Sequence, residues 1–459
     1  MGLNKPTNSR KSGRFFFIFL LIVVLGGGGA SYFLFFEGKA PTVNLDSIPE
    51  YLGAASTLNI TTSDVGSGLR KVNISASQKN TTKELYSHSY PRSGYTGPIG
   101  PMNDTQELPF DAKKLGFEDG EITISVTASD YSFRGFLSGN TVTASKTFTL
   151  DTKPPRLGIL HSERYIAPGG AGIAIYTMSD DDTEHHGVMI NSTFNKGYPI
   201  GDGRENTFIA YFGLPYDATE ISEARVIATD IAGNTSALPF SPIFKDPRQK
   251  HDRINISDGF LNTKVPEFEQ YYPDIPGDMV EKYLHINRNI RQENNKQIAE
   301  LCSEPVEDRL WQGRFHRMAG AGRAGFADHR TYYYNDKAID KQVHLGMDIA
   351  STRRVVIKAA NAGKVVFSDY LGIYGKMVLI DHGQGVFSLY SHLSQLNVNA
   401  GDMVATGDNI GNSGTSGMAG GDHLHFSMLI NGVFVTPIEW WDPNWIKITI
   451  DEPIVESRF

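Results

Sequence analysis

The chain of 459 residues contains a single cysteine, Cys302, and therefore cannot form an internal disulfide. It also lacks an excess of basic residues, because its formal net charge is -8 at pH 7, so the charge balance gives no support to a nucleic-acid partner. A structural zinc site would more typically offer four ligands with several cysteines, which this sequence does not supply. The remaining composition is that of a globular protein, and the length exceeds that of one domain.

The one long stretch without charge lies near the N-terminus. Residues 15–36 form a run of 22 uncharged, mostly apolar residues, which as a helix would cross a bilayer core of roughly 30 Å. Basic residues precede this run, namely Lys5, Arg10, Lys11 and Arg14. We therefore expect a cytoplasmic tail at 1–14 and an uncleaved, single-pass anchor at 15–36. A cleaved signal peptide is the alternative, but no small-x-small cleavage site stands out after the run.

The following two hundred or so residues predict β-structure, because short alternating stretches are separated by Gly, Pro, Asn and Asp. The pattern VTASD…GNT at 126–141 returns as VIATD…GNT at 226–235, one hundred residues later. This period is typical of β-sandwich modules, and the stretches loosely resemble bacterial immunoglobulin-like domains. We expect two such modules, at residues 40–152 and 153–246. A single irregular β-domain is the alternative.

The composition changes again in the second half of the chain. Residues 247–312 predict a helical connector, because the stretch 278–304 contains neither glycine nor proline and Asp278 could cap a helix. Apolar alternation and frequent glycine then predict a compact, antiparallel β-domain at 313–459. The expected fold class is mainly β, with one transmembrane helix, two sandwich modules, the connector and this C-terminal domain.

Two histidines in GDHLHF (421–426) are the first candidate for chemistry. His423 and His425 are two positions apart, so in a strand they share one face at about 6.6 Å, whereas in a helix they would point apart. This spacing allows one histidine to bind a metal while the other stands beside the open coordination position. Alone, the pair is weak evidence, because two solvated surface histidines would look the same.

A second cluster strengthens the metal hypothesis. In HLGMDIA (344–350), His344 and Asp348 alternate with apolar residues, and an extended strand would separate their α-carbons by about 13 Å. The strand should therefore bend or bulge at Gly346, where the missing side chain also leaves room for a metal. Three such ligands plus water are the arrangement of catalytic zinc. The ligand set also permits Mn or Fe, and we prefer zinc because nothing indicates redox chemistry.

With YSHL (390–393) between them, HLGMDIA and GDHLHF resemble the lysostaphin/LytM-type family of zinc endopeptidases, which cut peptides of bacterial cell walls. The resemblance covers about residues 325–445. It implies one zinc ion per C-terminal domain and two histidines that act without binding it. The residues that it implies are the zinc ligands His344, Asp348 and His425 and the catalytic residues His392 and His423.

The resemblance implies a bacterial, membrane-anchored peptidase that hydrolyses cross-link or stem peptides of peptidoglycan. Its partners would be peptidoglycan, the inner or plasma membrane and, through the β-modules, other cell-envelope proteins. The catalytic domain would be periplasmic or extracellular. Two alternatives stay open: a non-hydrolytic activator of another wall hydrolase, and a structural adhesin. The five intact polar positions favour the enzyme.

The topology can be tested directly. Because the basic flank precedes the apolar run, protease added to spheroplasts should digest the C-terminal domain, as followed by immunoblot. Full protection of that domain, with a known periplasmic protein degraded in the same sample, would overturn the predicted orientation.

Overall fold

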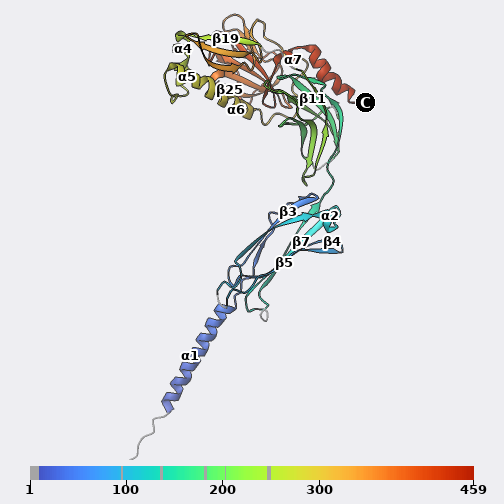
Figure 1. The fold of residues 1–459 in the computed structure, drawn as a ribbon, viewed down its shortest axis with the longest axis vertical. Coiled ribbons are helices and arrows are strands. Elements are labelled where there is room, and N and C mark those ends of the chain that lie inside the picture. The colour runs from blue at the N-terminus through green and yellow to red at the C-terminus, as the bar shows by residue number, and fades with distance from the viewer. Residues whose placement is uncertain are drawn as a thin grey trace, which may run out of the picture. The chain divides into compact units, whose positions relative to one another are not determined.

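A computed structural model describes residues 10–94, 97–134, 138–179, 183–201, 203–245 and 250–458. The chain divides into two compact units. The first extends to Pro154 and includes Ile231–Asn234, and the second comprises Pro155–Asp230 and the chain from Thr235 onward. Figure 1 follows the chain through both units. Residues 1–9 of the expected cytoplasmic tail lie outside the described residues, so the structure does not bear on that part of the prediction.

The first unit begins with helix α1 (Arg10–Phe35). Its segment Arg14–Tyr32 is long and apolar enough to cross a membrane, and the side chains from Phe15 to Leu25 are exposed. A long helix of exposed Phe, Leu, Ile and Val is what a bilayer core would solvate. The expected helix is therefore confirmed. A signal sequence near an N-terminus has the same properties, so the permanent anchor stays a prediction.

Strands β1 to β8 form what we call the first β-module, which consists of two sheets in the described residues. Alternating burial along its strands places one face of each sheet in a shared core that includes Leu58, Val72 and Val126. One sheet has the order β1 (Thr42–Asn44), β3 (Ala55–Ser63), β6 (Asn103–Asp111). The other has the order β2 (Tyr51–Leu52), β8 (Thr141–Leu150), β7 (Gly120–Asp130), β4 (Leu69–Gln78), β5 (Thr81–Ser89), and the short helix α2 (Ala112–Leu115) follows β6.

Strands β9 to β18 form what we call the second β-module, and it belongs to the second unit. It has two four-stranded sheets and a short parallel pair among the described residues. The first sheet is β14 (Tyr198–Pro199), β15 (Thr207–Gly213), β11 (Ala171–Ser179), β9 (Arg156–Ser162). The second is β13 (Thr193–Lys196), β12 (Thr183–Ile190), β16 (Ala224–Asp230), β17 (Thr235–Pro239), and the pair is β10 (Tyr165–Ile166) with β18 (Ile243–Phe244). Both modules are β-structure as expected, and their immunoglobulin-like character stays a prediction.

The connector is helical, and Asp278 caps a helix as expected. Its carboxylate accepts hydrogen bonds from the backbone N–H groups of Val280 and Glu281. In turn, the Asp278 N–H donates to the Glu281 carboxylate. Helix α5 (Met279–His285) then continues through a π-helical turn, η1 (Ile286–Ile290), into α6 (Arg291–Leu301). The connector also contains α4 (Asp258–Glu269) and a strand, β19 (His251–Ile256), which the sequence did not predict.

The C-terminal domain is built on one large sheet, mostly antiparallel as expected. Its order is β20 (Ala321–Ala324), β23 (Met347–Ala350), β31 (Leu424–Ile430), β27 (Val386–Leu393), β26 (Gly375–Asp381), β25 (Gly363–Leu371), β29 (Met403–Val404), with β32 (Val433–Val435) paired to β31. Two smaller sheets flank it. They are β24 (Val356–Lys358), β30 (Asn409–Asn412), β28 (Gln395–Leu396), and β19, β21 (His329–Tyr334), β22 (Lys337–Val343).

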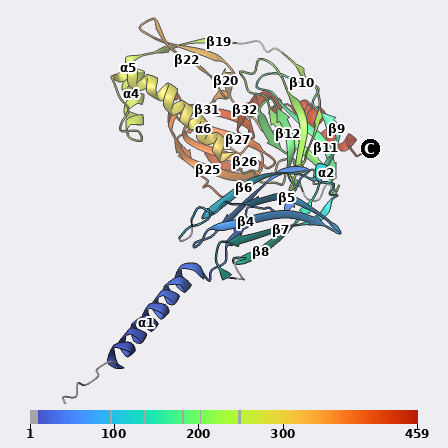
Figure 2. The same cartoon turned by 60° about the horizontal axis from the view of Figure 1, so that its bottom comes forward.

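Both faces of the large sheet are buried, which explains why nearly every residue of its central strands β26, β27 and β31 is buried and most are apolar. On one face, residues of α5 to α6 such as Ile290 and Ile298 pack on Phe387 and Leu429, and Figure 2 shows α6 lying along these strands. On the other face, Tyr211 of the second β-module shares a core with buried aromatic side chains of the C-terminal domain.

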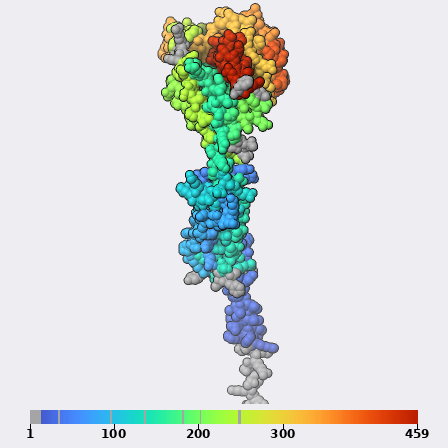
Figure 3. Space-filling view, turned by 90° about the vertical axis from the view of Figure 1, so that its right-hand side faces the viewer, coloured from blue at the N-terminus to red at the C-terminus, as the bar shows by residue number. Residues whose placement is uncertain are grey.

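The C-terminal helices complete this second face. They are α7 (Pro437–Trp441), α8 (Pro443–Ile446), the π-helical turn η3 (Lys447–Asp451) and α9 (Glu452–Glu456). Arg204 of the second β-module donates hydrogen bonds to the carbonyl oxygens of Ile454 and Ser457, and Figure 3 shows this red C-terminal segment against the green module. The second β-module is therefore part of the same folded unit as the large sheet.

Candidate metal centre

Three of the five expected site residues meet where β23 and β31 pair. Asp348 on β23 lies directly opposite His425 on β31 in the antiparallel register. His344 belongs to the short segment between β22, which ends at Val343, and β23, which begins at Met347. The chain thus leaves strand geometry around Gly346, as expected, and this lets His344 reach a residue four positions away.

The three side chains converge on one point and are buried. His344 Nε2 and His425 Nδ1 each lie 2.9 Å from Asp348 Oδ1, and the two nitrogens are 2.9 Å from each other. Among the described residues, this is the buried group of histidine and carboxylate that could hold one metal ion. Three donor atoms at such mutual distances can share a single small cation.

The hydrogen bonds around this cluster fix where the protons are. His344 Nδ1 is 2.7 Å from the carbonyl oxygen of Gly325, which can only accept, so this nitrogen carries the proton. The Ser427 hydroxyl donates to the Leu345 carbonyl oxygen, and it therefore accepts from His425 Nε2 at 3.1 Å. In the neutral rings, His344 Nε2 and His425 Nδ1 consequently present lone pairs to each other and to a carboxylate.

Lone pairs that face one another in a buried site repel unless a cation lies between them. Burial lowers the pKa of His425 to about 4, so that ring is neutral near pH 7. Burial also opposes ionisation of Asp348, but the neighbouring histidines outweigh it and hold its pKa well below the usual value. Two imidazole nitrogens and one carboxylate oxygen form the ligand set of a catalytic zinc site. The donor set therefore fits zinc.

The other two expected residues lie beside this cluster. His423 precedes β31, its Nδ1 is 2.7 Å from the Gly421 carbonyl oxygen, and its Nε2 is 3.5 Å from Asp348 Oδ1. His392 is the second-last residue of β27, and its Nδ1 is 2.9 Å from the Ser416 carbonyl oxygen. Each carbonyl can only accept, so each Nδ1 carries a proton and the Nε2 of each ring is the atom that can gain or lose one; for His423 this atom faces the Asp348 carboxylate.

The His392 and His423 rings are neighbours, and their pKa values are shifted in opposite directions. Their centroids are 4.9 Å apart, and the His392 ring is 5.7 Å from that of His425. Burial lowers the pKa of His392 well below its usual value. Burial would also lower the pKa of His423, but the Asp348 carboxylate outweighs it and raises that pKa. His392 also has a φ of 63°, a left-handed conformation that is uncommon for residues other than glycine and that concentrates at functional sites.

Sequence reasoning missed Arg330, which supports the cluster from β21. Its Nη2 donates to Asp348 Oδ2 at 3.1 Å, so it binds the oxygen that does not face the two histidines. This ion pair holds the carboxylate in one orientation, as the partners of metal ligands commonly do. Nothing in the sequence showed that Arg330 would face Asp348, which is 18 residues away.

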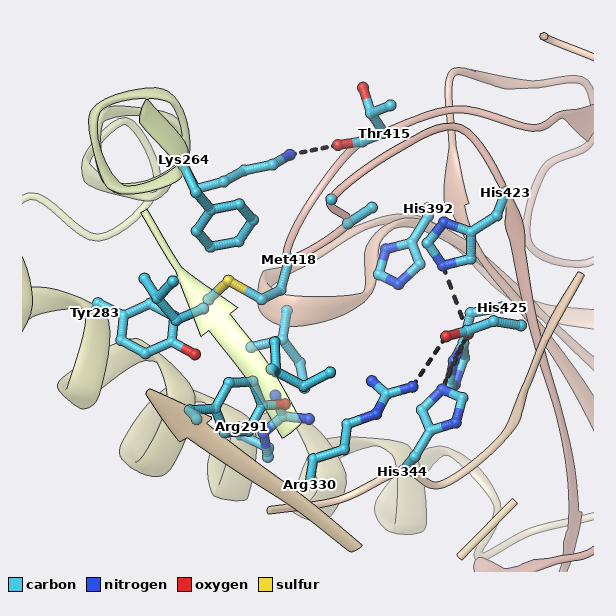
Figure 4. A pocket seen from close by; sticks show the side chains of 18 of the residues that line it. Lys264, Tyr283, Arg291, Arg330, His344, His392, Thr415, Met418, His423 and His425 are labelled. Atoms are coloured by element: carbon cyan, nitrogen blue, oxygen red, sulfur yellow. Dashed lines mark hydrogen bonds and ion pairs between the residues drawn. The ribbon is translucent and has the colours of Figure 1, made fainter. Parts of the chain in front are cut away.

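A cavity of about 700 Å³ adjoins the five residues. His344, His392, His423 and His425 line one side of it, and side chains of the connector line the other (Figure 4). Beyond these, the lining is part apolar, with Phe260, Tyr332, Ile373 and Met418. The site is thus a concave pocket that could hold a segment of a polymer, with the candidate metal ligands in its wall.

Comparison with known proteins finds a family model that matches this region. The family model of peptidase family M23 matches residues 342–437. The chain is 37% identical over 97 residues to DD-carboxypeptidase/endopeptidase Mpg of Neisseria meningitidis, covering 21% of this chain and 22% of that protein. It is 35% identical over 95 residues to the murein hydrolase activator EnvC of Escherichia coli, covering 21% and 23%. The chain therefore spans about a fifth of the length of these curated relatives.

A solved structure gives a similar result. The catalytic domain of the antimicrobial peptidase lysostaphin from Staphylococcus simulans is 26% identical, with a TM-score of 0.22, and the match covers 26% of this chain and 90% of that one. The family match at residues 342–437 contains the motifs on which the expected resemblance rested, and that resemblance is confirmed.

Gly346 offers a test of the fit to a metal. A Cβ atom at this position would lie 2.6 Å from His425 Nε2 and 2.6 Å from Ser427 Oγ, so it would displace the pair that orients His425. We expect Gly346→Ala to weaken zinc binding about 10–100-fold, the usual cost of disturbing the partners of a metal ligand. Zinc affinity would be measured by competition with a chromogenic chelator.

Gly420→Ala is the matched control, because a Cβ there would have no atom within 4 Å. Unchanged zinc affinity in Gly346→Ala would show that His425 does not depend on this contact. It would remove one support for the site.

Proposed function

Residues 342–437 belong to peptidase family M23, and from this premise we propose that the protein is a membrane-anchored zinc endopeptidase that hydrolyses peptide bonds of peptidoglycan. One observation carries the proposal: three buried lone pairs on His344, Asp348 and His425 converge within 2.9 Å of one another, at the wall of an open cavity. A single cation would stabilise such a set, and two further histidines stand beside it, with the Nε2 of His423 3.5 Å from Asp348 Oδ1.

The proposed chemistry is hydrolysis with water as the nucleophile. When bound, zinc would supply a Lewis acid that polarises the scissile carbonyl and brings the pKa of a water molecule toward ~7. His344 Nε2, Asp348 Oδ1 and His425 Nδ1 would hold the ion, and the negative charge of Asp348 would offset part of its charge. Arg330 would keep Asp348 from rotating, because it holds the second carboxylate oxygen.

The protons would be handled by His423 and His392. The carbonyl oxygens of Gly421 and Ser416 fix each Nδ1 as a donor, so each Nε2 is the atom that takes or gives a proton. His423 Nε2 is 3.5 Å from Asp348 Oδ1 and hence next to the ligand atoms. One of the two histidines would accept the proton of the attacking water. One of them would also pass a proton to the leaving amine. Either one can donate to the developing oxyanion.

A membrane anchor formed by α1 would suit a substrate that lies outside the cytoplasmic membrane. Peptidoglycan lies outside the cytoplasmic membrane, so a hydrolase of this polymer has to act there. An exposed apolar helix before the folded units would tether the protein to the membrane surface that faces its substrate. We therefore propose an extracytoplasmic C-terminal domain on a bacterial cell membrane.

The two histidines of GDHLHF should separate binding from chemistry. His425→Ala leaves only His344 and Asp348 as ligands, so zinc and activity should be lost together. His423→Ala keeps all three ligands, so it should retain near-stoichiometric zinc and lose turnover by about 10²–10⁴-fold. Metal content by atomic emission and release of muropeptides from purified sacculi would be measured on the same samples.

His316→Ala is the control, because His316 is exposed and has no place in the site. It should change neither quantity. Equal loss of zinc in His423→Ala and His425→Ala would mean that His423 is a ligand, and the assignment of roles would be wrong. Full activity in His423→Ala would exclude it from the proton transfers.

A further inference from the structure

The cavity beside the metal centre is rich in positive charge. Lys264, Arg291 and Arg330 line it, and Asp348 is the one carboxylate among the described residues that do so. The charge of Asp348 would be shared between the metal and Arg330, so it does not offset the other cations of the lining. Figure 4 shows Arg291 on the side of the connector helices and Arg330 reaching toward the cluster of His344 and His425.

The three cations differ in how they are compensated. Lys264 forms an ion pair with Glu267 at 3.0 Å and also donates to the Thr415 carbonyl oxygen. Arg330 pairs with Asp348. Arg291 has no carboxylate partner among the described residues, although it is partly buried. A partly buried charge without a counter-ion is costly, and proteins retain such groups mainly where a ligand supplies the opposite charge.

Arg291 is held in place by neutral groups. Its Nε donates to the Asn287 carbonyl oxygen at 3.0 Å, and its Nη2 donates to Asn287 Oδ1. Asn287 is fully buried, and its Nδ2 donates to Asp340 Oδ2 at 2.8 Å, which sets the orientation of the amide. The remaining nitrogen, Nη1, has no protein acceptor within the described part of the chain. The guanidinium group is therefore oriented in advance and retains a free donor edge.

The local backbone gives Arg291 this position. It is the first residue of α6 and follows the π-helical turn η1, in which one extra residue is accommodated per turn. Such turns are rare in helices and occur frequently at functional sites, because they change the direction in which the following side chains point. Here the change accompanies the placement of Arg291 in the cavity wall, whereas Lys296 on the same helix is exposed and pairs with Glu300.

We propose that Arg291, together with Arg330, binds a carboxylate group of the substrate peptide next to the scissile bond. The inference rests on the proposed function and specifies its substrate: a peptide cross-link that carries a free carboxylate, rather than an uncharged bridge such as oligoglycine. A guanidinium fork matches a carboxylate geometrically, and it discriminates against the amide because the amide nitrogen cannot accept. In a cross-link from D-alanine to diaminopimelate, two carboxylates qualify, one beside the cross-linking amine and one at the end of the acceptor stem.

The test compares substrates that differ only in one carboxylate. Cross-linked dimers with both carboxylates free, or with one or the other amidated, would be given to the full-length wild type, Arg291→Gln, Arg291→Lys and Lys296→Gln. We expect amidation of one carboxylate to lower wild-type kcat/KM about 10–100-fold, mainly through KM, as expected for the loss of a charged hydrogen bond. The amide that has this effect identifies the carboxylate that is bound.

The variants show whether Arg291 is responsible. On the substrate with free carboxylates, Arg291→Gln should lower kcat/KM by the same factor as amidation does in the wild type. It should no longer distinguish the free substrate from the amidated one, because removing both the arginine and the carboxylate costs no more than removing one of them. Arg291→Lys should fall between the two, since the charge remains but the fork is lost. Lys296→Gln removes an equal charge from the outer side of α6 and should behave as wild type. Amidation effects that persist unchanged in Arg291→Gln would overturn the proposal.

A binding measurement separates this inference from the proposed function. The product tripeptide of the acceptor stem, free or amidated, would be titrated into the full-length protein by calorimetry. Tighter binding of the free form in wild type, lost in Arg291→Gln, supports the subsite even if no peptidoglycan is hydrolysed, in which case only the proposed function fails. Equal binding of the free and amidated forms in wild type would overturn the subsite, whatever the hydrolysis assay shows.

Discussion

The proposed site depends on one electrostatic constraint: polar atoms of His344, Asp348 and His425 are buried and lie within 2.9 Å of one another, an arrangement that one small cation would stabilise. Each is directed by a fixed neighbour. The Gly325 carbonyl orients the His344 ring and the Ser427 hydroxyl orients the His425 ring. Arg330 holds the Asp348 carboxylate. Since none of these neighbours can reverse its role without losing its own hydrogen bond, the three side chains are oriented in advance for the proposed metal. The proposed hydrolysis builds on this arrangement, because His392 and His423 lie beside it and the Nδ1 of each is held by a backbone carbonyl.

The large sheet makes such an arrangement possible because both of its faces are covered. The connector helices pack on one face and the second β-module, with the C-terminal helices, packs on the other. Strands that are buried on both sides are rigid, so the direct pairing of Asp348 with His425 is held in register. The connector also forms the far wall of the cavity, since Lys264 and Glu267 of α4 bond to the loop at Thr415–Gly417. The same element that supports the sheet thereby gives the cavity its charge.

Much of the site could be predicted from the sequence, because its signals are local. Alternation in GDHLHF placed His423 and His425 at the start of a strand, and a glycine between His344 and Asp348 predicted the break that the structure shows. Arg330 and Arg291 could not be predicted in the same way. Arg330 reaches its partner because β21 pairs in parallel with β19, which lies 78 residues earlier, and Arg291 depends on a π-helical turn. Long-range pairing and irregular helix geometry leave no periodic pattern in a single sequence. The sandwich modules were visible as strands, but strand alternation does not specify which sandwich topology they adopt.

X-ray absorption at the zinc edge, measured on the full-length protein purified from zinc-supplemented cells, tests the central claim most directly. The account predicts one zinc per chain with nitrogen and oxygen neighbours at about 2.0–2.2 Å, two of them imidazoles, and no sulfur. A chain that retains no zinc under these conditions would contradict it. A spectrum with three or four imidazoles would also contradict it, because His392 or His423 would then be bound to the metal and unable to move protons.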